Sequence, residues 1–272
     1  MSFVSSVEQP DGEWDKAYWF CFQDNNLMLE KTDDQVLVPL LRQLDEKGIK
    51  PVRIQFIGMK EGIPCFSAEL PLNLIWPENC EFLNLKELFH QLDECTYKAA
   101  VYAHQIVVWD KNHQYCGVCG SETGNLPGER AKQCPQCGHV VFPRIAPAIM
   151  VAIIKDNKIL LAKNRMFRQG FYSVLAGFVD PAEQLEECVA REVKEEVGLT
   201  IKNLRYFGSQ PWPFPNSLMI AFTADHEDGE IAVDNREIIE ADWYSADKLP
   251  KCPTGNLSVA GRLIDWFKEN YS

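Results

Sequence analysis

The sequence predicts an α+β protein built from three parts. The chain has 272 residues, which is the length of about two domains. Two pairs of cysteines stand in a stretch with little apolar content, and apolar runs before and after this stretch alternate with turn signals. We therefore expect a mixed N-terminal domain at 1–110, a metal-binding segment at 111–143 and a larger domain at 144–272.

The composition is that of a folded globular protein. Hydrophobic residues make up 46% of the chain and charged residues 24%, which excludes a disordered chain. The net charge is −12, and residues 1–110 alone carry nine basic and 18 acidic side chains. Such an acidic balance argues against broad binding to nucleic acid through its phosphates.

Neither a membrane span nor a signal peptide is expected. The longest apolar run, Ile145–Ile154, is ten residues long, whereas a spanning helix needs about 20. The first residues lack the basic start and the apolar core of a secretory signal. The sequence thus predicts a cytoplasmic protein, in which ten cysteines are metal ligands or buried thiols rather than disulfides.

The N-terminal part contains no catalytic motif. Its apolar runs predict short strands, and we expect a helix at 83–92. We find no internal repeat in the sequence. The predicted strands lie at 19–22, 36–41, 51–57 and 70–75.

Four cysteines in the middle segment predict a structural zinc site. They are Cys116, Cys119, Cys134 and Cys137, in two CxxC pairs whose spacing resembles a zinc ribbon. Buried or redox-active thiols are the alternative. Because four thiolates fill a tetrahedral site, this zinc should hold no open coordination position.

Alternating strands and helices are expected after residue 144. Strands at 148–154 and 158–162 are joined by Asp156-Asn157, which is a hairpin signal. A helix at 181–197 would begin with Asp180 as its cap and Glu183 as the partner in a capping box. A last helix is expected at 258–270, and the other strands at 172–178, 204–207, 217–224 and 240–244.

The helix at 181–197 carries unusual glutamates. At about 100° per residue, Glu192 and Glu196 fall in the middle of its apolar stripe, and Glu195 lies beside it. A buried carboxylate is costly unless its charge is compensated, and converging carboxylates repel one another. A divalent cation resolves both problems, and oxygen ligands favour Mg²⁺ or Mn²⁺. The alternative is a solvated helix that happens to be rich in glutamate.

The same segment resembles the Nudix box at every specified position. Gly177 is followed after five residues by Glu183 and after seven more by Arg191-Glu192-Val193, and the segment ends with Glu195-Glu196-Val197-Gly198-Leu199. The resemblance implies a Nudix hydrolase, with an α/β/α sandwich at 144–272 and catalysis by Glu192, Glu195, Glu196 and Arg191. It implies metal ligation by those three glutamates, by the backbone carbonyl of Ala176 and by Glu237. The base that takes the proton of water is Glu195 or Glu196, and Glu183 has a cap or a chemical role.

A proline-rich run follows the box. Gln210-Pro-Trp-Pro-Phe-Pro-Asn-Ser217 resembles the signature of NADH pyrophosphatases, a Nudix subgroup that also removes NAD caps from RNA. The zinc segment belongs to the same layout. Stiff prolines can present aromatic rings to a base at little entropic cost, although the rings can instead pack inward. The implied substrate-binding residues are Phe142, Phe178, Gln210, Pro211, Trp212, Pro213, Phe214, Pro215, Asn216, Ser217 and Ala260. Phe142 stands where relatives often carry tyrosine.

The leading prediction is metal-dependent hydrolysis of NAD(H) to nicotinamide mononucleotide and AMP, and of NAD-capped RNA to a 5′-monophosphate. The resemblance also implies a homodimer. An ADP-ribose or ADP-sugar pyrophosphatase is a second interpretation, and a zinc-ribbon binding module with a vestigial Nudix domain is a third. Lys163, Arg165 and Arg168 are expected to be solvated surface side chains, with phosphate contacts as the alternative.

Overall fold

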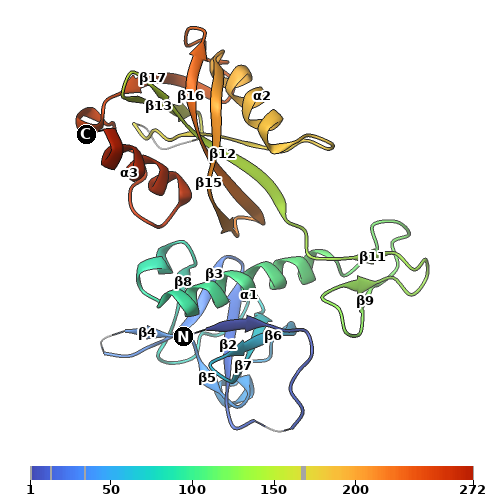
Figure 1. Cartoon of the computed structure of the whole chain (residues 1–272). Coiled ribbons are helices and arrows are strands. Elements are labelled where there is room, and N and C mark those ends of the chain that lie inside the picture. The colour runs from blue at the N-terminus through green and yellow to red at the C-terminus, as the bar shows by residue number, and fades with distance from the viewer. Residues whose placement is uncertain (1, 13, 34, 167–169, 272) are drawn as a thin grey trace. The chain divides into compact units, whose positions relative to one another are not determined.

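The computed structural model describes residues 2–12, 14–33, 35–166 and 170–271. The chain divides into two units, Met1–Arg144 and Ile145–Ser272, which we treat separately (Figure 1). No helix in the described ranges is both long enough and apolar enough to cross a membrane.

The second unit is a mixed sheet between two helices. The strand order is β15-β16-β12-β13-β17, β14 pairs with β12, and β12 and β16 are parallel. Helices α2 and α3 lie on opposite sides of the sheet (Figure 1). The elements are β12 (Ala146–Lys155), β13 (Lys158–Asn164), β14 (Leu175–Phe178), α2 (Leu185–Val197), β15 (Thr200–Trp212), β16 (Ser217–Asp228), β17 (Ile238–Tyr244), a 3₁₀ turn η3 (Ala246–Lys248) and α3 (Val259–Tyr271).

Alternation along β12 builds two cores. Ile149, Val151 and Ile153 face α2, whereas Ala152 and Ile154 face α3. Successive side chains of a strand point to opposite faces, so a strand buried on both sides reads as one apolar run. The predicted hairpin is confirmed: Asp156 and Asn157 both have positive φ, and β12 pairs with β13 on either side of them.

Helix α2 begins four residues later than predicted. Ala182 has a φ of 68°, a left-handed conformation that a helix cannot include. The cap is Gln184, and Glu187 completes the capping box. The prediction of Asp180 as the cap was therefore wrong, and Glu183 instead accepts a hydrogen bond from the Asp180 amide in the preceding turn.

The first unit repeats this topology without the long glutamate helix. Its sheet has the order β1-β6-β7-β2-β3-β4, with β5 on β2 and β8 on β3. The elements are β1 (Phe3–Ser5), β2 (Ala17–Gln23), β3 (Asn26–Lys31), β4 (Val36–Leu37), β5 (Leu40–Leu41), η1 (Leu44–Lys47), β6 (Arg53–Lys60), β7 (Ile63–Glu69), β8 (Cys80–Asn84), η2 (Glu87–His90) and α1 (Glu94–Asn112).

The correspondence covers every strand of the second sheet, while β1 and β4 of the first have no counterpart. The hairpin β2–β3 matches β12–β13, parallel β7 matches β16, β6 matches β15, and β8 matches β17. Short β5 pairs with β2 as β14 pairs with β12, and α1 follows as α3 does. The sequence analysis therefore missed this repeat, because the two units share a strand topology and not a recognisable sequence.

Two predictions for the N-terminal part were wrong. The expected helix at 83–92 is a strand end followed by the 3₁₀ turn η2, and the long helix is α1. The run at 70–75 forms no strand, because β7 ends at Glu69. Asp93 caps α1 by accepting a hydrogen bond from the Thr96 amide, a signal that could have located the helix.

A small sheet holds the cysteine segment together. Strands β9 (Gly124–Asn125), β10 (Lys132–Gln133) and β11 (Val140–Val141) form it in the order β11-β10-β9. Lys132 Nζ lies 2.6 Å from Asp110 Oδ1 of α1, and both side chains are buried. This pair ties the segment to the helix before it.

Candidate active site and zinc site

The four cysteine sulfurs converge as the sequence predicts. They lie within 4.8 Å of one another and, among the residues described, form the one such group of three or more potential metal ligands. Backbone hydrogen bonds lower the pKa of the Cys116 thiol and bring the pKa of Cys119 to about 6. Gly120 and Gly138 have positive φ, and their amides donate to the carbonyls of Cys116 and Cys134. Two matching turns thus present four sulfurs as a tetrahedral zinc site requires.

Arg191 organises the carboxylates of α2. Its Nε and Nη2 donate to the two oxygens of Glu183 at 2.6 and 2.9 Å. Its Nη1 donates to Glu192 at 2.9 Å and to Glu195 at 3.2 Å, and Nη2 also donates to the carbonyl of Phe178. One guanidinium therefore fixes the helix to the turn before it and to the end of β14.

Glu183 serves this arrangement as an anchor. The Arg191 guanidinium, aided by the Asp180 amide, lowers the pKa of the Glu183 carboxyl to about 2. A bidentate arginine–carboxylate pair has a fixed geometry. The cap alternative was wrong, because α2 begins at Leu185, and Glu183 instead positions Arg191; the chemical role stays a prediction.

Glu192 lies directly against the backbone of β14. A Cβ added at Gly177 would collide with its carboxyl group, so any larger residue there would displace Glu192 from this position. The carbonyl of Ala176, the predicted backbone ligand, belongs to the residue before Gly177 in the same strand. Burial raises the pKa of Glu192 in spite of Arg191.

Glu196 is the most deeply buried carboxylate of the set. Its residue is 5% exposed, and Oε2 has no hydrogen-bond partner among the described residues. Burial first, and then the charges of Glu192 and Glu237, raise its pKa to about 8. This oxygen is buried, lacks a protein donor and lies near other carboxylates, which is the environment that a bound cation would stabilise.

The remaining acidic residues surround this carboxylate at different depths. The side chain of Glu195 is 62% exposed, and Glu237 is exposed but close enough to raise the pKa of Glu192 and Glu196. The carboxylates remain more widely spaced than the four sulfurs, since they do not meet within 4.8 Å.

Glu237 is supported by Asp234, which the sequence reasoning did not single out, and by Arg165, for which it expected a solvated surface position. Asp234 accepts hydrogen bonds from the amides of Glu237 and Ile238, and its own amide donates to the carbonyl of Glu196. Arg165 donates to the carbonyls of Asn235 and Arg236. Arg165 therefore holds the loop that carries Glu237. Lys163 Nζ lies 3.9 Å from Glu240 Oε2. Arg168 lies outside the described residues.

The proline-rich run is the tip of a hairpin rather than a free loop. Pro211 and Trp212 are the end of β15 and pair with Leu218 and Ser217 of β16, and residues 213–216 form the turn. The rings of Trp212 and Phe214 meet edge to face at 5.5 Å. Pro213 and Ser217 are buried, Pro211 and Pro215 are exposed, and Asn216 is half-buried.

Gln210 uses both ends of its side chain within the protein. Its Nε2 donates to the carbonyl of Leu257, and its Oε1 accepts from the amide of Val259. These bonds fix the start of α3, where Ala260 is buried. Phe178 is 58% exposed at the end of β14, whereas Phe142 is 54% exposed in the other unit and is not placed relative to this site.

Comparison with known proteins gives a consistent result for all three parts. The profile "NUDIX domain" matches residues 144–267, "NADH pyrophosphatase zinc ribbon domain" matches 111–142, and "NADH pyrophosphatase-like rudimentary NUDIX domain" matches 16–109. The NAD-capped RNA hydrolase NudC of Pseudomonas fluorescens strain Pf-5 is 41% identical over 211 residues, covering 78% of this chain and 76% of that protein. The protein of the same name from strain Pf0-1 is 36% identical over 97% of this chain and 92% of its own length.

The chain belongs to the NADH pyrophosphatase family of Nudix hydrolases.

It is a Nudix pyrophosphohydrolase with a zinc ribbon between a rudimentary and a complete Nudix domain. A crystal structure of a NUDIX hydrolase from Nitrosomonas europaea has the same fold, with a TM-score of 0.50 at 21% identity over 58% of this chain and 92% of that chain. Nudix chemistry uses a divalent metal, which the orphaned oxygen of Glu196 fits.

Proposed function

We propose that this protein hydrolyses the pyrophosphate bond of NAD(H) to nicotinamide mononucleotide and AMP, and removes NAD caps from RNA, leaving a 5′-monophosphate. The observation that carries the chemistry is the buried Glu196 carboxylate, with one unpartnered oxygen, on the helix that Arg191 fixes. The names of the similar bacterial proteins support the choice of substrate.

The catalytic metal in this proposal is Mg²⁺ or Mn²⁺. Glu192, Glu195, Glu196 and Glu237 would hold it together with the carbonyl of Ala176, because hard cations prefer oxygen ligands. When bound, such an ion neutralises pyrophosphate oxygens and lowers the pKa of a bound water.

The side chains of the chain perform the remaining tasks. Arg191 holds Glu192 and Glu195 at fixed positions, and Glu183 holds Arg191. Glu195 or Glu196 takes the proton of the attacking water. Exposed Glu195 can return that proton to solvent, whereas Glu196 is buried.

Recognition of the dinucleotide is proposed for Phe178 and the tip of the β15–β16 hairpin. The exposed ring of Phe178 follows Ala176 and Gly177 in β14 and can stack on a base. We assign contacts with substrate to Pro211, Trp212, Pro213, Phe214, Pro215, Asn216, Ser217, Ala260 and Phe142. Gln210 acts indirectly in this proposal, by holding the start of α3 beside Ala260.

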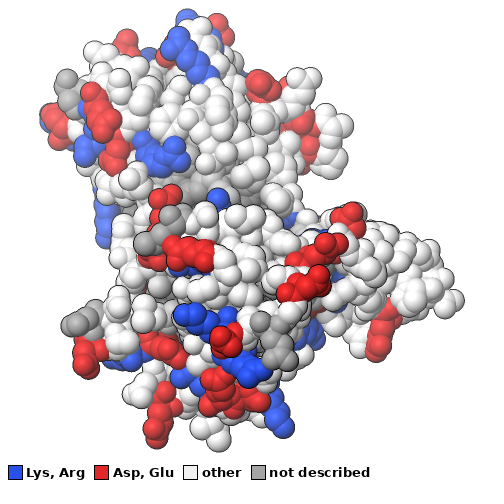
Figure 2. Space-filling model, turned by 60° about the horizontal axis from the view of Figure 1, so that its bottom comes forward, with Lys and Arg blue, Asp and Glu red and all other residues white. Residues whose placement is uncertain are grey.

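Any contact with RNA should be limited to the region of the cap. Basic and acidic side chains are interspersed on the face shown in Figure 2, and the net charge is −12. Weak attraction for a phosphate backbone favours recognition of the NAD end.

Product analysis with separate substrates tests the proposal. The protein is given NADH, NAD⁺ and ADP-ribose with Mg²⁺ or Mn²⁺, and then an NAD-capped RNA. Preferred conversion of NADH or NAD⁺ to a nicotinamide mononucleotide and AMP is expected. Faster cleavage of ADP-ribose would favour the ADP-ribose pyrophosphatase, and binding without cleavage would favour the binding module.

We also propose that the protein works as a homodimer in the cytoplasm. All ten cysteines are unpaired, which suits a reducing compartment. The dimer rests on the resemblance to NADH pyrophosphatases. Light scattering on the purified protein should give twice the mass of the 31.1 kDa chain, and a monomer would contradict the proposal.

A further inference from the structure

The rudimentary domain lacks the helix that covers one face of its sheet. In the second unit, α2 stands between β14 and β15 and packs on the side of β12 that carries Ile149 and Val151. The corresponding link between β5 and β6 contains only the single 3₁₀ turn η1. In the first unit this face carries Trp19 of β2 and Phe66 of β7, while Phe22 on the opposite face contacts His104 of α1.

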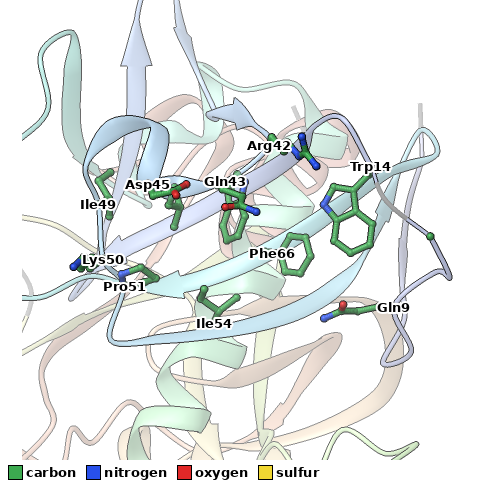
Figure 3. Close-up of a pocket in the computed structure, with 13 residues that line it drawn as sticks. Gln9, Trp14, Arg42, Gln43, Asp45, Ile49, Lys50, Pro51, Ile54 and Phe66 are labelled. Atoms are coloured by element: carbon green, nitrogen blue, oxygen red, sulfur yellow. The ribbon is translucent and has the colours of Figure 1, made fainter.

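A cavity of about 650 Å³ opens on this face (Figure 3). It is lined by Trp19, Ile54 and Phe66 from the sheet, by residues of η1 and its flanks, and by the N-terminal segment around Trp14. Its volume lies within the range of about 300–1,000 Å³ that is typical of small-molecule sites. The cavity thus occupies the place that the topology gives to the catalytic helix in the second unit.

The wall of the cavity is aromatic. Trp19 and Phe66 stack with their ring centroids 4.8 Å apart, and Trp14 tilts over Phe66 at 5.7 Å. Trp19 is almost fully buried, whereas Trp14 is partly exposed, and Figure 3 shows Trp14 beside Phe66. Phe66 and Trp19 are buried against each other, so the partly exposed ring of Trp14 is the surface on which a heterocycle can stack.

The rim of the cavity is polar and carries two cations. Arg42 and Lys50 are exposed at its edge, and Gln43 and Asp45 lie between them in the chain. Either cation can pair with a phosphate, and the amide and carboxylate can bond to base amino groups or ribose hydroxyls. The first 110 residues have a net charge of −9, which disfavours a polyanion and favours a ligand with a single phosphate.

We propose that this cavity is a second nucleotide site, which binds a mononucleotide with its base against Trp14 and its phosphate at the cationic rim. Among the described residues, its wall carries no counterpart of the glutamate cluster around α2, so we expect the site to bind without hydrolysing. A mononucleotide is also the product class of the proposed reaction. Occupancy of the cavity would therefore report the level of product.

Calorimetric titration of the full-length protein with AMP tests the site. The titration omits Mg²⁺ and Mn²⁺ and compares wild type with Trp14→Leu, Lys50→Gln and Arg42→Gln. We expect Trp14→Leu to weaken AMP binding at least about tenfold and at least one cation variant to do the same. Trp76→Leu and Lys31→Gln are matched controls, because both side chains are exposed in the same unit but do not line the cavity. Melting temperatures verify that each variant is folded.

Equal AMP affinity in wild type and Trp14→Leu would overturn the proposal, whatever the stoichiometry. So would adenosine binding as tightly as AMP, because the phosphate would then contribute nothing. Hydrolysis of saturating NADH by Trp14→Leu should equal that of wild type. The cavity proposal can therefore fail while the proposed function stands.

Discussion

The ion pair of Glu183 and Arg191 determines where the carboxylates of α2 lie. Placing the half-buried Arg191 among three glutamates is favourable because its N–H groups find acceptors, and the pair to Glu183 is bidentate. The resemblance implied a catalytic role for Arg191, and the sequence left Glu183 with a cap or a chemical role. The cap role fails because the backbone of Ala182 is left-handed, a conformation that an alanine in the sequence does not predict.

Glu183→Gln should change the acid sensitivity of the protein. The pKa of Glu183 falls from 4.5 to about 2 in the folded chain, so its contribution is complete above pH 4.5 and is lost as the pH falls toward 2. The variant should therefore unfold at lower urea concentration than wild type at pH 7, and the difference should shrink below pH 4.5. Its turnover should fall about 10- to 100-fold, as is typical when a supporting partner is removed.

Urea unfolding from pH 7 to pH 3 measures this effect. Glu186→Gln, an exposed change on the same helix, is the control and should match wild type at each pH. A difference between Glu183→Gln and wild type that stays constant down to pH 3 would contradict the account.

His104 should make the first unit sensitive to mild acid. It is buried, its Nε2 lies 3.1 Å from Asn25 Oδ1, and burial lowers its pKa to about 4. The unfolded chain takes up the proton near pH 6.5, so stability is complete above that pH and is lost as the pH falls from 6.5 toward 4. The loss should reach about 3 kcal/mol.

Chemical unfolding at each pH, with amide exchange in α1 as the probe of the first unit, measures this loss of stability. His104→Gln, which cannot take up a proton in this range, should flatten the dependence between pH 6.5 and 4. An equally steep dependence in that variant would assign the effect to other groups.

At the scale of elements, helix α2 shows both what periodicity predicts and what it misses. The placement of Glu196 in the apolar stripe was correct, because it depends only on 3.6 residues per turn. The start of the helix was wrong, because it depends on the backbone at Ala182. The support of Glu237 by Asp234 and Arg165 was missed, since Arg165 is remote in sequence and contacts only carbonyls.

Gly177→Ala tests the contact between β14 and α2. The added methyl would occupy the space of the Glu192 carboxyl group, so the helix or the side chain must move. A displacement of about 1 Å at a reacting centre can cost about 100-fold in rate, and we expect a loss of that order in turnover. Gly124→Ala, where the methyl meets no neighbour, is the control. Unchanged NADH turnover in Gly177→Ala would contradict the geometry.

Removal of zinc should loosen the ribbon alone. The amides of Gly120 and Gly138 bond to carbonyls within the two cysteine turns, and metal binding is what holds such turns together. A thiol-selective chelator, or Cys137→Ser, should raise the exchange rates of these amides while α1 stays protected. Exchange that is unchanged after zinc loss would show that the ribbon folds without metal.

At the scale of the whole molecule, the same sheet topology occurs twice in the chain. The strand orders β6-β7-β2-β3-β8 and β15-β16-β12-β13-β17 agree, yet the sequence shows no repeat. Sheets of one topology need apolar faces rather than particular residues. Corresponding strands can therefore have unrelated sequences, as in β2 (AYWFCFQ) and β12 (APAIMVAIIK). Helix α1 escaped prediction for a related reason, since small alanines form much of its buried face.

The central claim is that only the second copy carries chemistry, through the carboxylates of α2. The most direct test is NADH turnover by Glu196→Gln against wild type and Glu186→Gln, with Mg²⁺ or Mn²⁺ and equal protein folding verified by circular dichroism. The account predicts a loss of at least about 100- to 1,000-fold in Glu196→Gln, as for the removal of a group that stabilises the transition state. It predicts wild-type turnover in Glu186→Gln. Wild-type turnover in Glu196→Gln would contradict the claim and place the reaction elsewhere in the chain.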